Sequence, residues 1–158
     1  MTRTQLPIES QLHARYMQGD FLDCYTVAST LTAQQAAAII VDFPTWAKGL
    51  VTLRNLITAP FGLMPDGPDA PAKLGLFPVE ISSEKEVIVG FNDRHLDFRI
   101  SVFRKQGQIY LATWVHPHNL GGRIYLKTIS PFHVLIVRNA LSRVANADQP
   151  GQKSAILE

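Results

Sequence analysis

The sequence predicts an α+β domain in which a curved antiparallel sheet is wrapped against a long C-terminal helix. Three observations favour this fold class. Apolar and polar residues alternate with a period of two in segments from Phe77 to His116, which is the spacing of half-buried strands. Apolar residues recur at helical spacing over the last third of the chain. Two shorter segments after the first predicted strand are also helical in pattern.

The first half of the domain is expected to contribute one strand and two short helices. Phe21 to Ala28 reads as a strand, because large apolar residues are spaced among small ones. Thr32, with Gln35 three positions later, is a capping-box pattern that opens an alanine-rich helix to about Asp42. A second helix is predicted from about Thr45 to Thr58, because its apolar residues fall on one face.

The central region is predicted to be a long loop followed by two hairpins. Ala59 to Gly75 is rich in proline and glycine, which indicates a mobile connection or a lid. Phe77 to Ile81 and Val87 to Phe91 form the first hairpin, and Arg94 to Arg104 pairs with Gln108 to His116 in the second. The strand from Arg94 is expected to have one buried and one solvent-exposed face. Its buried face is Leu96, Phe98, Ile100 and Val102, and its exposed face is His95, Asp97, Arg99 and Ser101.

The last third allows three interpretations. A helix from Pro131 to Val144 is one, with Ser130 as its cap. Apolar and small residues also step by four from Leu120, so the helix can begin there and kink at Pro131. Alternation over residues 124–127 would instead make a further strand. We favour the long helix. The expected organisation is an irregular, poorly fixed arm over residues 1–19, one domain over 20–145 and a flexible tail over 146–158.

Composition narrows the classes of function. The chain has 158 residues, 46% of them hydrophobic and 18% charged, as in an ordinary globular domain. A formal net charge of +2, with scattered basic residues, gives no support to nucleic-acid binding. The single cysteine, Cys24, is expected to be buried and inert. No signal segment or membrane span is recognisable, so a cytoplasmic location is expected.

Four stretches carry a resemblance to a known superfamily: Phe43-Pro-Thr-Trp46, Leu53-Arg-Asn55, Asp93-Arg-His-Leu-Asp-Phe-Arg99, and Gly122-Arg-Ile-Tyr125 followed by Pro131-Phe-His133. From about Asp20 to Arg143 the chain resembles the helix-grip fold of the START and birch-allergen-like (SRPBCC) superfamily. It looks most like an uncharacterised bacterial family of that superfamily, a domain of unknown function that occurs alone or appended to NAD-binding epimerase-like domains. The resemblance implies an apolar ligand cavity between sheet and helix, and no particular reaction.

Several polar residues are candidates for catalysis, each with a structural alternative. His95, Asp97 and Arg99 project from one face of a strand, where a carboxylate can orient an imidazole for acid–base work. The same pattern is typical of cross-strand ion pairs on a solvent-exposed face. His116 and His118 flank Pro117 and would need a third protein ligand to bind zinc, so no metal site is predicted.

The remaining candidates would line the cavity. Trp46, Phe98, Trp114 and Tyr125 are large aromatic residues that can either contact a ligand or fill the core. Arg54, or alternatively Arg123, could bind an anionic group, although an arginine stem more often covers apolar surface. Tyr125 is also a candidate for proton transfer, together with His95, Asp97 and His116.

The sequence therefore leads to three hypotheses. The first is a carrier that binds a small apolar or amphipathic ligand between the sheet and the C-terminal helix. The second is an enzyme that performs acid–base chemistry in the same cavity, like a cyclase, dehydratase or hydrolase. The third is a protein-interaction module with a filled core. No nucleotide, serine-hydrolase or zinc-protease motif occurs, so no cofactor is expected, and the pattern does not specify an oligomeric state.

Overall fold

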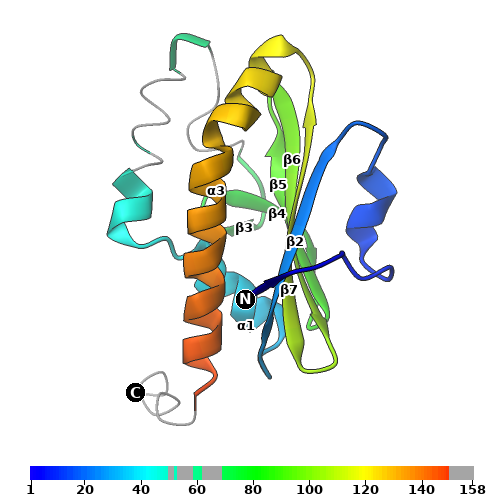
Figure 1. The fold of residues 1–158 in the computed structure, drawn as a ribbon, viewed down its shortest axis with the longest axis vertical. Helices are drawn as coiled ribbons and strands as arrows, with labels where there is room; N and C mark the ends of the chain where they lie inside the picture. Colours follow the sequence, from blue (N-terminus) through cyan, green and yellow to red (C-terminus); the bar gives the residue numbers. More distant parts are fainter. Residues whose placement is uncertain (50–51, 53–58, 62–68, 150–158) are drawn as a thin grey trace.

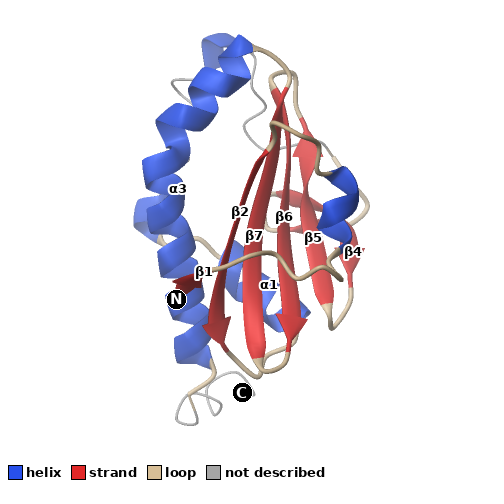
Figure 2. Cartoon of the chain, turned by 45° about the vertical axis from the view of Figure 1, so that its right-hand side comes forward, coloured by secondary structure: helices blue, strands red, loops and turns tan. Residues whose placement is uncertain are grey.

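A computed structural model describes residues 1–49, 52, 59–61 and 69–149. It is a seven-stranded antiparallel sheet in the order β1-β2-β7-β6-β5-β4-β3, with a long helix running along one face (Figures 1 and 2). The strands are β1 (Thr2–Arg3), β2 (Phe21–Ala28), β3 (Lys73–Leu74), β4 (Phe77–Ser82), β5 (Glu86–Asn92), β6 (Leu96–Lys105) and β7 (Gln108–Pro117). The helices are α1 (Ala33–Val41) and α3 (Leu120–Ala147), with short 3-10 turns η1 (Gln11–Arg15) and η2 (Ala59–Phe61). The predicted helix-grip architecture is confirmed.

The locally encoded elements lie where the sequence places them. The Thr32 side chain accepts a hydrogen bond from the Gln35 amide, and the Gln35 side chain accepts one from the Thr32 amide, so the predicted capping box forms at the start of α1. Of the second predicted helix, residues 45–49 are helical, whereas most of the remainder to Thr58 lies outside the described residues. The predicted loop from Ala59 to Gly75 contains η2 and β3 at its ends, and residues 62–68 lie outside the described part.

The long C-terminal helix is confirmed, and the alternative strand over residues 124–127 is wrong. The side chain of Asn119 caps α3 by accepting a hydrogen bond from the Gly122 amide at 3.0 Å. Pro131 lies inside the helix, where it removes one backbone hydrogen bond and crowds the carbonyl one turn earlier. Figure 1 shows that α3 bends between its yellow-orange N-terminal turns and its straight orange C-terminal turns.

Each face of the sheet carries its own apolar cluster. On the helix face, which is the face toward α1 and α3, the core includes Tyr25, Val102, Leu111 and Leu141. On the outer face, which is the opposite one, a second cluster contains Leu6, Leu12, Cys24, Ile88, Ala112 and Trp114. Two of these outer-face residues, Leu6 and Leu12, come from the N-terminal arm. The arm is largely irregular, as expected, apart from β1 and η1, but it is not poorly fixed, because it covers the outer face.

This cover corrects the expected exposed face of β6. Phe98 and Arg99 do lie on opposite faces, as predicted, but Ser101 and Arg99 are buried on the outer face and Phe98 is only half-buried on the helix face. The physical reason is a hydrogen-bonded junction beneath the arm. The buried carboxylate of Glu86 accepts hydrogen bonds from Ser10 Oγ at 2.5 Å, from the Gln11 amide at 3.0 Å and from Ser101 Oγ at 2.8 Å.

Within the described residues, no helix is long and apolar enough to cross a membrane. The Cys24 thiol is buried, and desolvation followed by the nearby charge of Asp23 raises its pKa to about 12. The expected burial of Cys24 is confirmed, and the raised pKa disfavours the reactive thiolate.

Candidate functional site

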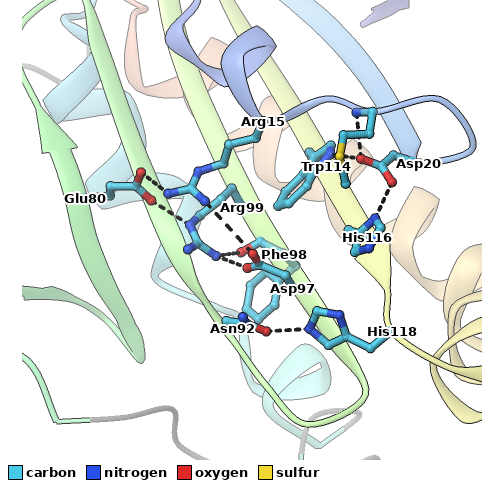
Figure 3. A network of polar contacts seen from close by, with 11 residues as sticks. Arg15, Asp20, Glu80, Asn92, Asp97, Phe98, Arg99, Trp114, His116 and His118 are labelled. Atoms are coloured by element: carbon cyan, nitrogen blue, oxygen red, sulfur yellow. Dashed lines mark hydrogen bonds and ion pairs between the residues drawn. The ribbon is translucent and has the colours of Figure 1, made fainter.

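Ion pairs on the outer face connect β6 to the arm. The Arg99 guanidinium contacts the carboxylates of Asp97 and Glu80, the latter at 2.6 Å from Nε, and Arg15 of η1 contacts Glu80 as well (Figure 3). Burial alone would raise the pKa of Glu80, but its hydrogen bonds to Arg15 and Arg99 outweigh burial and lower it. These two arginines and two carboxylates balance in charge, so the group fastens η1 to the sheet rather than offering a charged site to a ligand.

A second outer-face group joins His116 to Asp20. Asp20 Oδ1 lies 2.5 Å from His116 Nδ1, while Oδ2 accepts hydrogen bonds from Trp114 Nε1 at 2.8 Å and from the Met17 amide at 2.9 Å (Figure 3). Desolvation would raise the pKa of Asp20, but the hydrogen bonds from His116, Met17 and Trp114 lower it overall. Asp20 thus orients the His116 imidazole. Sequence reasoning missed Asp20 because it precedes the strand and lies far from His116 along the chain.

The predicted trio of His95, Asp97 and Arg99 does not assemble. His95 lies before β6 begins at Leu96, and its Nδ1 is 3.1 Å from Asn119 Oδ1, at the start of α3. Only Asp97 and Arg99 pair with each other. His118 in turn hydrogen-bonds Asn92 Oδ1 at 2.6 Å through Nε2. In the part of the chain that is described, no three His, Cys, Asp or Glu side chains gather to hold a metal ion.

The helix face contains a polar pair that sequence reasoning also missed. Asp23 of β2 is buried, its side chain only 4% exposed, and its Oδ2 lies 2.9 Å from Nε2 of His133 in α3. The Phe21 ring and the His133 imidazole meet edge to face, with their centroids 6.1 Å apart. Asp23 Oδ1 is buried and has no hydrogen-bond partner among the described residues. A signal was present, because Asp23 shares the parity of the core residue Tyr25, which predicts a carboxylate on the buried face.

α3 is fixed firmly at both of its ends. At the N-terminal end Gly122 packs so closely that an added Cβ would lie 2.1 Å from the His95 carbonyl oxygen. At the C-terminal end Val137, Ala140, Leu141 and Val144 are buried against α1 and the sheet. We call residues 137–147 the closed half of α3.

The intervening residues 123–136, which we call the open half, contain no buried residue. Leu126, Ile129 and Val134 are half-buried, whereas the apolar side chains of Ile124, Phe132 and Leu135 are 45–58% exposed. An apolar segment of a helix normally buries one stripe against its own domain. The open half does so incompletely.

The predicted cavity-lining residues divide between different surfaces. Phe98 lies on the helix face and meets Phe77 and Phe91 edge-on, at ring-centroid distances of 5.8 and 4.9 Å. Trp114 alternates to the outer face, so it does not border the space between sheet and helix. Trp46 is 45% exposed. Tyr125 and Arg123 lie in the open half of α3, the first half-buried and the second exposed, and Arg54 lies outside the described residues.

Comparison with known proteins identifies a family but assigns no activity to it. The chain matches no curated protein and no solved structure. One family profile, described as a protein of unknown function (DUF2867), matches residues 16–140. This match begins in the arm, before β2, and ends in the closed half of α3, so it includes the Asp20–His116 and Asp23–His133 pairs. The chain therefore belongs to the DUF2867 family of proteins of unknown function.

Proposed function

We propose that this protein binds a small apolar or amphipathic molecule between the open half of α3 and the strands that face it. The observation that carries the proposal is the contrast between fixed ends and an uncovered middle. Gly122 and the Val137–Val144 segment hold the helix on the sheet, yet no residue from 123 to 136 is buried. Apolar side chains left partly uncovered on the inner side of a helix gain free energy when a ligand covers them.

The facing strands support the same proposal. Phe21, Phe77 and Phe98 are half-buried aromatic residues on the helix face, and Phe98 contacts the more deeply buried Phe91. Covering about 200 Å² of apolar surface at ~25 cal/mol per Å² corresponds to ~5 kcal/mol before the costs of ordering. One or two hydrogen bonds at about 1 kcal/mol each raise this to about 6–7 kcal/mol, so a ligand of modest size would bind with a dissociation constant of roughly 10 μM to 1 mM once the ordering costs are subtracted.

The architecture supports membership in a larger group. A curved sheet against a long C-terminal helix is the arrangement implied by the resemblance to the START and birch-allergen-like superfamily, and we infer that the chain belongs to it. In that superfamily ligands occupy the space between sheet and helix. Fold alone does not specify the ligand, so the proposal depends mainly on the incomplete burial of the open half.

The test compares two tryptophan substitutions on α3. Leu126 precedes His133 by seven residues, which places it within about 20° of His133 around the helix axis. Leu126→Trp should fill the space toward the sheet and weaken binding of the uncharged fluorescent probe Nile red at least tenfold. Leu135→Trp is the matched control, because Leu135 is 52% exposed and points about 160° away from His133. It should leave the affinity unchanged.

Binding is measured by probe fluorescence and by the rise in melting temperature. The probe is accompanied by a panel of fatty acids, sterols and aromatic acids. A wild-type protein that shows saturable binding to none of these compounds would refute the proposal. Equal affinity in both tryptophan variants would place the ligand elsewhere on the molecule.

Acid–base catalysis in the same place is a second candidate, favoured by the Asp23–His133 hydrogen bond. A carboxylate that fixes one imidazole nitrogen leaves the other oriented for proton transfer. Any compound that binds should be recovered after long incubation and compared by mass spectrometry. A product formed by the wild type but not by His133→Phe would support an enzyme, and unchanged ligand would support a carrier.

A further inference from the structure

We propose that the imidazole of His133, held in place by Asp23, accepts a hydrogen bond from a hydroxyl group at the polar end of the ligand. This inference rests on the proposed function and adds the chemistry of the ligand. It predicts that the protein selects alcohols or phenols attached to an apolar body, rather than pure hydrocarbons or anions.

The contact between the two side chains determines which imidazole nitrogen carries hydrogen. An ionised carboxylate can only accept hydrogen bonds, so the 2.9 Å contact between Asp23 Oδ2 and His133 Nε2 requires a hydrogen on Nε2. In the neutral imidazole the other nitrogen, Nδ1, then presents a lone pair. The ligand atom that complements it is a hydrogen-bond donor, and a hydroxyl group is the simplest donor on an otherwise apolar molecule.

The position of His133 fits this role. It lies in the open half of α3, its side chain is 20% exposed, and the Phe21 ring lies against its imidazole. The half-buried residues on its side of the helix, Leu126 and Ile129, are apolar. The neighbouring hydroxyl of Ser130 already donates to the Leu126 carbonyl at 2.7 Å. His133 therefore offers a ring nitrogen to a polar ligand atom on a side of the helix where Leu126 and Ile129 are apolar.

The state of Asp23 supplies an independent observation. Its side chain is more than nine-tenths buried, and Oδ1 has no hydrogen-bond partner among the described residues. Leaving a buried acceptor unsatisfied is unfavourable for folding, and an apolar residue at this strand position would avoid the cost. A buried carboxylate that orients a histidine is a common exception, because it serves a site rather than the stability of the core.

The decisive ligands are 2-naphthol and 2-methoxynaphthalene, which share an apolar body but differ in the ability to donate a hydrogen bond. The wild type should bind 2-naphthol roughly tenfold more tightly, the ratio expected for one additional hydrogen bond. His133→Phe should lose this preference while keeping its affinity for the ether. His118→Phe is the matched control, since His118 bonds Asn92 at a strand end, and it should keep the preference.

A spectroscopic measurement on the unmodified protein covers the case in which His133→Phe fails to fold. The ¹⁵N resonance of His133 Nδ1 should move toward that of a hydrogen-bonded acceptor when 2-naphthol is added, and should not move with the ether. If both compounds bind and the ¹⁵N resonance of His133 Nδ1 moves with neither of them, the inference is wrong.

The outcomes separate this inference from the proposed function. If neither naphthalene binds and the wider panel also fails, the proposed function is wrong. If both bind with equal affinity to the wild type, ligand binding stands and the role of His133 is refuted. Tighter binding of 2-naphthoate than of 2-naphthol would also refute it, because a carboxylate requires a donor at Nδ1.

Discussion

The two halves of α3 have similar apolar content but very different surroundings. In the closed half, Val137, Leu141 and Val144 meet α1 and the sheet and are buried. In the open half, Leu126 and Ile129 have comparable side chains but remain half-buried. The difference lies in what stands opposite. α1 supplies small residues such as Ala36 and Ala37 that let the closed half approach closely, whereas the open half faces the aromatic residues at the far end of the strands.

This comparison teaches that one helix can serve two purposes. The closed half contributes to the stability of the domain, and the open half contributes surface that the domain itself does not use. The same separation should be measurable as a difference between stability and binding, and the following predictions test it.

The largest effect is expected from truncation in the closed half. Leu141 is fully buried, so Leu141→Ala should lower the free energy of unfolding by about 2–5 kcal/mol. Leu126→Ala, the matched change in the open half, should cost about 1 kcal/mol or less because less surface is lost. Urea denaturation followed by circular dichroism provides both values. Equal losses would mean that the open half is packed as tightly as the closed half.

The next effect concerns Arg143, which joins the closed half to the C-terminus of α1. Its guanidinium donates hydrogen bonds to the carbonyls of Ile39, Asp42 and Ile40, at 2.5, 2.6 and 3.4 Å. Arg143→Gln should lower the free energy of unfolding by about 1–2 kcal/mol, since those carbonyls lose their partners. Arg138→Gln is the control on the exposed side of the same helix and should change stability by about 0.5 kcal/mol or less.

Removal of the Asp23–His133 pair should raise the free energy of unfolding, unlike the two changes above. The double substitution Asp23→Leu with His133→Phe replaces a buried, partly unsatisfied carboxylate and its half-buried imidazole partner by apolar groups, and should raise the free energy of unfolding by about 1 kcal/mol. It should also remove the preference for 2-naphthol. Thermal denaturation and ligand titration of the same preparation test both statements. A marked loss of stability would show that the pair supports the fold.

The smallest effect is a pH dependence of stability at Asp20, which bonds the end of the arm and lies apart from both halves of α3. The pKa of Asp20 is lower in the folded state than its ordinary value of 3.8. Its carboxylate therefore adds stability above pH ~4, and this stability is lost as the pH falls through the folded pKa. Asp20→Asn should make the decrease in stability between about pH 5 and pH 2 shallower. If the variant shows the same pH profile as the wild type, Asp20 does not contribute to the loss of stability in acid.

Much of the fold could be predicted because its signals are local. Alternation predicted β2 and the strands from β4 to β7, and the Thr32–Gln35 pattern predicted the start of α1. The exposed face of β6 was predicted wrongly, because nothing near Arg99 in the sequence reveals that residues 1–19 fold over it. Coverage of a strand by a remote segment is a tertiary property.

The candidate site was harder to predict than the fold. His116 was identified as a candidate by its residue type, but its partner Asp20 was not, because the two lie far apart in the chain. The pairing of Asp23 with His133, also across most of the chain, was missed altogether. Side-chain pairing depends on the arrangement of whole elements. The parity of Asp23 along β2 indicates its direction, yet only the placement of α3 shows that an imidazole meets it.

Pro131 has a mechanical consequence for the helix in which it lies. α3 is held at Gly122 and at the buried Val137–Val144 segment, and Pro131 interrupts its backbone hydrogen bonding between them. A helix held at both ends bends most easily at such an interruption. A ligand that enters between α3 and the sheet would then bend the helix at Pro131 and leave both fixed ends in place. The affinity for molecules of different thickness would then vary gradually with size rather than ending at a sharp limit.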